Sequence, residues 1–223
     1  MIRLRNVTKT YRTRTEHRTV LDNVSCHFEI GHNYGILGAN GTGKSTLVRM
    51  LAGSEPPTRG QIERGVRVSF PLGFSGTMNS YLTGRQNAAF MARVYGEDVR
   101  RVLDFVWDFA ELGTYFDMPL PSYSSGMRAR FGMGVSLAIN FDLYLIDEVT
   151  EVGDRSFRAK SQAAFRDRAL TSDVILVSHN PLTIRSYCDR AAVLSGGKLV
   201  FYSDVESAIA AHDAQQKLIW HGK

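Results

Sequence analysis

Eight consecutive residues of this chain have the composition of a loop that wraps an anion. They match the pattern G-x-x-x-x-G-K-[ST] and are Gly38-Ala39-Asn40-Gly41-Thr42-Gly43-Lys44-Ser45. Glycines let backbone N–H groups surround a phosphate, and the start of a following helix adds partial positive charge. Lys44 is suited to reach the β- and γ-phosphates of a nucleotide and Ser45 to hold Mg²⁺. The segment, together with the next residue, Thr46, therefore predicts a nucleotide site.

Two further polar pairs come directly after buried apolar runs. Asp147-Glu148 follows Leu143–Ile146, and Ser178-His179 follows Val174–Val177. The carboxyl ends of parallel strands meet at the edge of a sheet where ligands bind. We expect Asp147 to organise the Mg²⁺ shell, Glu148 to activate a water as general base, and His179 to contact the γ-phosphate and that water. The alternatives are a helix-capping acidic turn and a structural histidine.

Two aromatic positions complete the candidate chemistry. Tyr11 ends the first expected strand, where its ring is suited to stack on adenine, although ordinary surface packing is the alternative. Tyr123 opens the segment Tyr123-Ser124-Ser125-Gly126-Met127, a small polar turn before a helix, with Ser124 or Ser125 as its N-cap. This turn suggests a second phosphate surface that acts on a partner's nucleotide.

The elements that must position these residues alternate between strands and helices. We expect strands near Ile2–Val7, 20–30, 33–37, 61–70, 143–146, 174–177, 191–194 and 199–202, and helices at 44–52, within 84–112 as a pair, and at 126–139, 156–170 and 205–217. Buried runs that alternate with helices imply an α/β fold with a largely parallel sheet covered on both faces. The block around 84–112 indicates an inserted helical subdomain.

Bulk composition narrows the class of protein. The 223 residues are 43% hydrophobic and 22% charged, enough for a large core and unlike a disordered chain. The net charge of +5 fits a mildly basic surface or contact with an anionic partner, but the basic residues form no arm, so nucleic-acid binding is not expected. Two cysteines without CxxC spacing predict buried free thiols. No signal peptide or membrane span is evident, which predicts a cytoplasmic protein.

Together these motifs resemble the nucleotide-binding subunits of ABC transporters. The segment Tyr123–Met127 is similar to the family's signature motif, usually leucine-serine-glycine-glycine-glutamine, and departs from it at three of five positions. The resemblance implies a P-loop NTPase core with an N-terminal antiparallel β subdomain. It further implies that ATP and Mg²⁺ are bound and that two copies pair head to tail. Ser124, Ser125, Gly126 and Met127 of one copy would then cover the ATP of the other, and Asp154 would lie at the dimer axis.

Several further segments of the sequence resemble the corresponding segments of ATPases that export capsular polysaccharide. They are Arg128-Ala129-Arg130, Val149-Thr150, Val152-Gly153-Asp154, Phe116–Pro119 and Leu82–Asn87. The resemblance implies a peripheral ATPase on the cytoplasmic face of the inner membrane, bound to a permease pair and through it to periplasmic and outer-membrane partners. The chain ends after its last expected helix, which favours the capsule branch. Export of another lipid-linked glycan, such as O-antigen or teichoic acid, and a soluble ATPase acting on nucleic acid are the alternatives.

The resemblance also implies subdomain boundaries, and the sequence departs from the family's pattern at two further places. We expect residues 1–72 and 140–223 to form the core with its β subdomain, and 73–139 to form the helical subdomain with the signature motif. The loop after Phe70 lacks the glutamine that usually meets Mg²⁺, so Asn79, Ser75 or water would take that place. Glu151 stands where a small residue is expected, and it either adds charge near the dimer axis or faces solvent.

Overall fold

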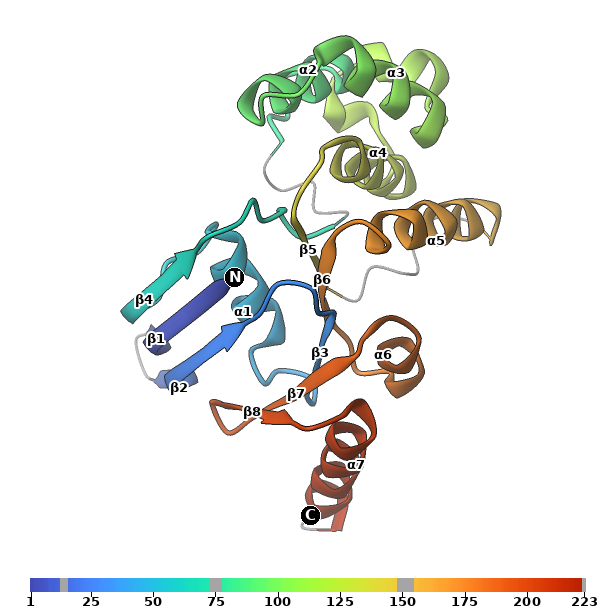
Figure 1. Ribbon diagram of the computed structural model, residues 1–223. Helices are drawn as coiled ribbons and strands as arrows, with labels where there is room; N and C mark the ends of the chain where they lie inside the picture. The colour runs from blue at the N-terminus through green and yellow to red at the C-terminus, as the bar shows by residue number, and fades with distance from the viewer. Residues whose placement is uncertain (13–15, 73–77, 148–154, 222–223) are drawn as a thin grey trace. The chain divides into compact units, whose positions relative to one another are not determined.

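The computed structural model describes residues 1–12, 16–72, 78–147 and 155–221, with residues 217–221 described by their backbone alone (Figure 1). Contacts divide the chain into two compact units. The first consists of Met1–Pro71, Asp142–Glu148 and Ser172–Lys223, and the second, the helical unit, consists of Leu72–Phe141 and Val149–Thr171. The sequence-based boundaries assigned all of 140–223 to the core. Contacts instead group helix α5 (Arg155–Ala169) with the helical unit, because α5 packs on α4 (Ser125–Ala138).

The first unit contains a five-stranded sheet with the strand order β5-β6-β3-β7-β8. Its first four strands are parallel, whereas β8 pairs antiparallel with β7 across a turn at Gly196-Gly197. The strands are β3 (Tyr34–Leu37), β5 (Leu143–Asp147), β6 (Asp173–Val177), β7 (Arg190–Ser195) and β8 (Lys198–Tyr202). The prediction of a largely parallel sheet is therefore confirmed.

A second, antiparallel sheet of the first unit is formed near the N-terminus. Its strands are ordered β2-β1-β4 and comprise β1 (Ile2–Arg12), β2 (His17–Phe28) and β4 (Arg59–Arg64). The register places Tyr11 opposite Arg18, so the two side chains come from paired strand ends. The predicted antiparallel β subdomain is confirmed, although β2 begins three residues before the expected Val20 and ends before Ile30.

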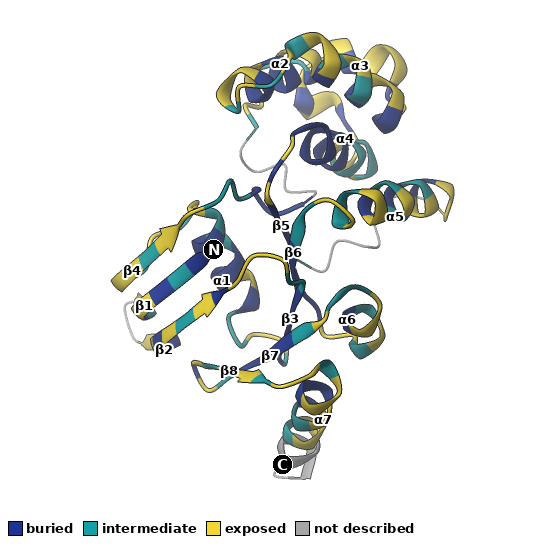
Figure 2. Cartoon of the chain, in the orientation of Figure 1, coloured by how far each residue is buried: buried dark blue, intermediate teal, exposed yellow. Residues whose placement is uncertain are grey.

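Helix α1 (Lys44–Ala52) lies between the two sheets. Its Leu47, Val48, Met50 and Leu51 are fully buried in one cluster with side chains of both sheets. Strand β3 is buried along its whole length (Figure 2). Its Ile36 belongs to the cluster around α1, whereas Gly35 lies against Ile184 of α6 (Pro181–Tyr187). Helix α7 (Val205–His221) packs on β7 beside α6, so helices cover both faces of the parallel sheet, as expected.

Helix α6 is absent from the sequence-based elements, although the sequence carries its start signal. Asn180 is the N-cap, and its side-chain oxygen accepts a hydrogen bond from the backbone N–H of Leu182 at 2.9 Å. Pro181 occupies the first turn, where its fixed φ suits a helix. The helix is only seven residues long, so its apolar pattern is too short to be read by periodicity.

The helical unit forms as the periodicity predicts, with a break near Gly96. Helices α2 (Gly84–Val94) and α3 (Val99–Ala110) are followed by two 3₁₀ turns, η1 (Gly113–Asp117) and η2 (Leu120–Ser122), and then by α4. Thr83 and Gln86 form a capping box at the start of α2. The apolar faces of α2, α3 and α4 pack together, and Gly134 of α4 lies beside Phe109 of α3.

Two expectations about the surface and the thiols can be compared with the described residues. None of the helices that the structure describes is long and apolar enough to cross a membrane. Cys26 and Cys188 are free thiols, but both are half-buried rather than buried as expected. Burial still raises the pKa of each thiol to about 12, so both are expected to be unreactive at neutral pH.

A polar cluster joins β1 to α1 and to the turn that follows it. The Tyr11 hydroxyl donates to Glu55 Oε1 at 2.6 Å and lies 3.1 Å from Thr46 Oγ1. Lys9 Nζ and Arg49 Nε lie 2.8 and 2.9 Å from the same carboxylate. Burial alone would raise the pKa of Glu55, but the hydrogen bonds from Lys9, Tyr11 and Arg49 outweigh it and lower the pKa to about 2. The Tyr11 ring is thus fixed by an ionised Glu55.

Because the folded-state pKa of Glu55 is depressed, its contribution to stability is present above the unfolded value, about 4.5, and is lost as the pH falls towards about 2. We expect the free energy of unfolding of the wild-type protein to lose about 1 kcal/mol from this group between pH 6 and pH 3.5. Urea titrations of wild type and Glu55→Gln at both pH values measure it.

The stability advantage of wild type over Glu55→Gln should shrink as the pH falls. Glu63→Gln is the matched control, because Glu63 pairs with Arg5 on the exposed side of β4. An advantage of the same size at both pH values would show that Glu55 is not held ionised by this cluster.

Candidate functional site

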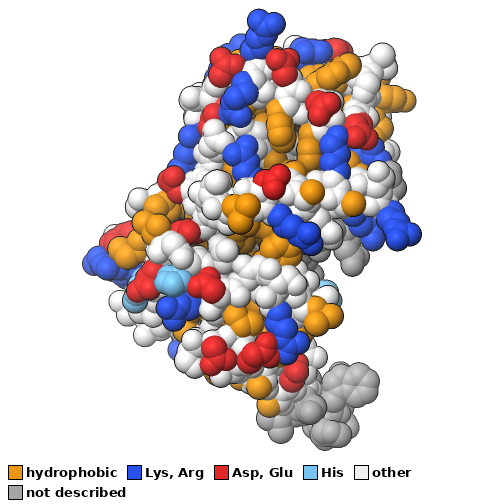
Figure 3. All heavy atoms as spheres, turned by 45° about the vertical axis from the view of Figure 1, so that its right-hand side comes forward, with side chains coloured by type: hydrophobic (Ala, Val, Ile, Leu, Met, Phe, Trp, Pro, Cys, Tyr) orange, Lys and Arg blue, Asp and Glu red, His pale blue; other side chains and the backbone are white. Residues whose placement is uncertain are grey.

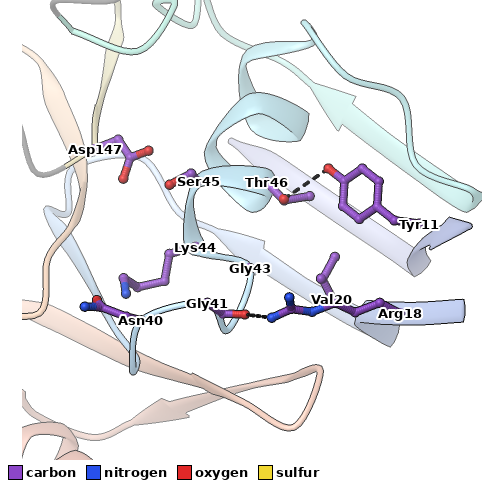
Figure 4. Close-up of a pocket in the computed structure, with 10 residues that line it drawn as sticks. All are labelled: Tyr11, Arg18, Val20, Asn40, Gly41, Gly43, Lys44, Ser45, Thr46 and Asp147. Atoms are coloured by element: carbon purple, nitrogen blue, oxygen red, sulfur yellow. Dashed lines mark hydrogen bonds between the residues drawn. The ribbon is translucent and has the colours of Figure 1, made fainter. Parts of the chain in front are cut away.

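A cavity of about 370 Å³ opens at the phosphate-binding segment of the first unit (Figure 4). It is built by the loop between β3 and α1, the ends of β1 and β2, and the carboxyl end of β5. Its lining combines backbone amides, hydroxyls, two cations and one carboxylate. The residues are Tyr11, Arg18, Val20, Asn40, Gly41, Gly43, Lys44, Ser45, Thr46 and Asp147.

The loop conformation requires its glycines. Gly41 and Gly43 have φ values of 78° and 105°, which side chains rarely adopt. A Cβ on Gly38 would lie 2.7 Å from the carbonyl oxygen of Leu194 in β7, so the loop begins in close contact with the sheet. Gly43 is the N-cap of α1, and no side chain caps the helix there. The first N–H groups of α1 are therefore left for an anion.

Lys44 lies at the centre of the loop. Its side chain is 7% exposed, and its Nζ donates to the carbonyl oxygens of Gly38 and Ala39 at 2.8 and 3.1 Å. Thr42 fixes the loop from within, because its hydroxyl donates to the Ala39 oxygen at 2.9 Å. The amine is thus held inside the curve of the loop, where a cation would meet the phosphate groups of a nucleotide.

The side chains of Ser45 and Asp147 line the same cavity. Ser45 is the second residue of α1, and Asp147 is the last residue of β5. A hydroxyl and a carboxylate are oxygen donors of the type that Mg²⁺ prefers. The pair therefore fits a Mg²⁺ ion that keeps most of its ligands as water and phosphate oxygen.

The opposite end of the cavity carries Tyr11 and Arg18. Arg18 reaches from β2 and donates to the carbonyl oxygen of Gly41 at 2.6 Å (Figure 4). The sequence-based site did not include Arg18. The one feature that could have indicated Arg18 is its pairing with Tyr11 across the hairpin. That pairing depends on the geometry of the turn, which the sequence pattern did not define. The guanidinium adds a second positive charge beside the loop.

Not every expected residue lies at this cavity. His179 follows β6 at the same edge of the sheet, but it is not among the lining residues. Glu148 and Asp154, together with Ser75 and Glu151, lie outside the described residues. Their roles stay predictions.

Asn79 belongs to the helical unit. Its side-chain oxygen accepts a hydrogen bond from the Tyr81 N–H at 2.9 Å, and its backbone N–H donates to Asn87 Oδ1 at 2.9 Å. These bonds give Asn79 a structural role before α2. Its role as a metal ligand stays a prediction.

The signature segment begins α4, as expected, with Ser124 as the N-cap. Ser124 Oγ accepts the N–H of Met127 at 3.2 Å. Ser124 and Ser125 are exposed, whereas Gly126 and Met127 are partly exposed. A serine hydroxyl that accepts one bond still has its proton to donate. The exposed start of a 14-residue helix thus presents a hydroxyl donor and backbone N–H groups, the chemistry that suits an anion.

The chain is similar to known proteins in sequence and in fold. The model of the ABC transporter family matches residues 21–151. The chain is 44% identical over 217 residues to the ATP-binding protein BexA of Haemophilus influenzae, covering 97% of this chain and 100% of that protein. It is 45% identical over 208 residues to the capsule polysaccharide export ATP-binding protein CtrD of Neisseria meningitidis serogroup B, covering 93% and 96%.

The polysialic acid transport ATP-binding protein KpsT of Escherichia coli is 41% identical over 221 residues, covering 98% of this chain and 99% of that protein. Among solved structures, the chain is similar to the dimeric cassette MJ0796 in a post-hydrolysis state bound to ADP and Pi. That likeness has a TM-score of 0.73 and 22% identity over 89% of this chain and 96% of that chain. It confirms the predicted fold, and the family match and the relatives show that this chain belongs to the ABC transporter family.

Proposed function

We propose that this chain is the ATP-hydrolysing subunit of an exporter of capsular polysaccharide across the inner membrane. The observation that carries the proposal is the 41–45% identity, over nearly the whole chain, to capsule and polysialic acid export proteins. The phosphate-binding loop, with Lys44, Ser45 and Asp147 around one cavity, supports it chemically. Two copies would bind a pair of membrane-spanning permease subunits on the cytoplasmic face.

In the proposed reaction, the loop residues from Gly38 to Thr46 bind the phosphates of ATP, and Lys44 contacts the β- and γ-phosphates. Tyr11 stacks on adenine, held in place by its hydrogen bond to Glu55. Ser45 and Asp147 hold Mg²⁺, which supplies charge neutralisation at the phosphates when bound. Glu148 removes a proton from the attacking water, and His179 orients that water and the γ-phosphate.

The signature segment would complete the site of a second copy. Its exposed Ser124 hydroxyl and the start of α4 are suited to the γ-phosphate that the partner's loop holds. The two copies would pair head to tail with an ATP at each of two sites. Asp154 would then lie near the axis between them. Closure of this pair on ATP, and its reopening after hydrolysis, would drive the permease.

The proposed surface for the permease is the part of the helical unit from Gly84 to Leu112, with the segment before it. Three apolar side chains there are well exposed, Tyr81 at 91%, Phe90 at 53% and Val94 at 57%. Figure 3 shows hydrophobic side chains between charged ones on the part of the helical unit that it views. Periplasmic and outer-membrane export partners would be reached through the permease.

Export of another lipid-linked glycan is the alternative, since an ATPase need not touch the exported chain. A soluble ATPase that acts on nucleic acid is a distant one. Two experiments separate the three functions. The chain is purified from its native membrane to identify the permease bound to it, and its gene is deleted to identify the glycan that is lost. Loss of capsule supports the proposal. Loss of O-antigen or teichoic acid, or salt-dependent binding of DNA without a permease, contradicts it.

The general base is tested by Glu148→Gln. We expect this variant to bind ATP and to dimerise with it, but to hydrolyse ATP at least about 100-fold more slowly, because proton transfer to a positioned base contributes about 10²–10⁴-fold. Phosphate release assays and sedimentation with ATP measure the two properties. Glu63→Gln, on the exposed side of β4, is the control. Wild-type hydrolysis by Glu148→Gln would exclude Glu148 as the base.

The shared site is tested by Ser124→Arg. The bulky cation blocks the exposed start of α4, so we expect ATP binding by the single subunit to be unchanged and turnover to fall to background. Ala210→Arg adds the same side chain to an exposed position of α7 and should leave turnover unchanged. Normal turnover of Ser124→Arg would contradict a signature segment that contacts nucleotide.

A further inference from the structure

The residue before the signature serine is a buried tyrosine in an unusual setting. Tyr123 is 2% exposed, and its ring meets Phe131 of α4 edge-on with centroids 6.0 Å apart. The hydroxyl oxygen makes no hydrogen bond of ordinary geometry to the residues that the structure describes. Burying a hydroxyl without such a bond is unfavourable. A phenylalanine would fill the same space without that penalty, so stability alone does not explain the hydroxyl.

The hydroxyl is directed at the first residue of α2. A Cβ on Gly84 would lie 2.2 Å from the Tyr123 oxygen, so only glycine leaves room for it. Phe116 forms another wall, since its Cδ2 atom and carbonyl oxygen would both lie 3.1 Å from that Cβ. Burial raises the pKa of Tyr123 to about 12, although the nearby Gly84 N–H lowers it, so the hydroxyl keeps its proton at neutral pH.

Backbone hydrogen bonds join the same two segments. The N–H of Gly84 donates to the Met118 oxygen, and the N–H of Leu120 donates to the Leu82 oxygen, each at 3.3 Å. Thr83 and Pro119 form an isolated antiparallel bridge between them. The stretch that leads into α2 is therefore paired with the stretch that leads into the signature segment, and the Tyr123 hydroxyl lies where the two end.

The segment before α2 is itself rigidly attached to the helix. Asn87, which is 1% exposed, donates from Nδ2 to the backbone oxygens of Asn79, Leu82 and Thr83 at 3.0–3.3 Å. The same segment carries Tyr81, whose side chain is 91% exposed. A displacement of this exposed segment would therefore move Gly84, and with it the wall against which the Tyr123 hydroxyl rests.

We propose that Tyr123 is a positioning residue, whose hydroxyl, seated against Gly84, sets the place of Ser124 and the start of α4 relative to the segment 79–84. The inference rests on the proposed function, since it gives the signature segment its role at a partner's ATP. It adds a physical contact by which the exposed surface before α2 controls that segment. Tyr123 acts through Ser124 and does not touch the nucleotide.

The test uses the full chain with its permease and measures kcat and KM for ATP. Tyr123→Phe removes only the hydroxyl. We expect kcat to fall at least about threefold with KM for ATP unchanged, because Ser124 is then held less precisely for turnover while the subunit's own nucleotide site is untouched. The melting temperature should change little, since the ring keeps its packing against Phe131 and the hydroxyl that is removed makes no hydrogen bond of ordinary geometry. Tyr115→Phe removes the hydroxyl of a tyrosine that is 43% exposed in the same unit and should change neither constant.

Gly84→Ala approaches the contact from the other side. The added methyl meets the hydroxyl, so kcat should fall by at least about tenfold. Combination with Tyr123→Phe removes the closest of its contacts and should recover part of the loss, since coupled residues are not additive. Wild-type kcat in Tyr123→Phe, or additive losses in the double variant, would overturn the inference. If Gly84→Ala does not fold, Tyr123→Phe decides alone.

The Ser124→Arg variant separates a failure of this inference from a failure of the proposed function. If Ser124→Arg retains full turnover, the proposed function itself fails. If Ser124→Arg is inactive and Tyr123→Phe is fully active, only this inference is refuted.

Discussion

The close approach of the loop between β3 and α1 to the parallel sheet is the constraint on which the site depends. A side chain on Gly38 would collide with a backbone oxygen of β7, so the loop can begin its curve only as glycine. The curved loop accepts a hydrogen bond from the Lys44 amine through the carbonyl oxygen of Gly38. It also leaves the first backbone N–H groups of α1 without a side-chain cap. The fully buried face of α1 then anchors the helix between two sheets. Core packing thereby fixes the position of the loop that we propose to bind phosphate.

The local part of this arrangement was predictable from sequence. The loop motif and the helix at 44–52 agree with the structure because glycine spacing and apolar periodicity are local signals. The sequence allowed either Ser124 or Ser125 as the N-cap of this helix. In the structure the Met127 N–H donates a hydrogen bond to Ser124 Oγ, so Ser124 is the N-cap. A start signal alone was too weak to reveal the seven-residue α6.

The non-local part was not predictable. Arg18 reaches the cavity because of hairpin register, and Glu55 holds Tyr11 because the turn after α1 returns to β1. The contact of Tyr123 with Gly84 joins residues far apart in the chain, and each looks ordinary by itself. Helix α5 was expected in the core by sequence order, whereas its packing on α4 groups it with the helical unit. These features depend on tertiary contacts rather than on composition.

The central claim is that one copy's phosphate loop and another copy's signature segment share an ATP. The most direct measurement is an experimental structure of Glu148→Gln with ATP, Mg²⁺ and its permease. The account predicts a γ-phosphate bonded both to Lys44 Nζ of its own chain and to Ser124 Oγ of the partner subunit, each at about 3 Å. An ATP whose γ-phosphate contacts no residue of a second copy would contradict it.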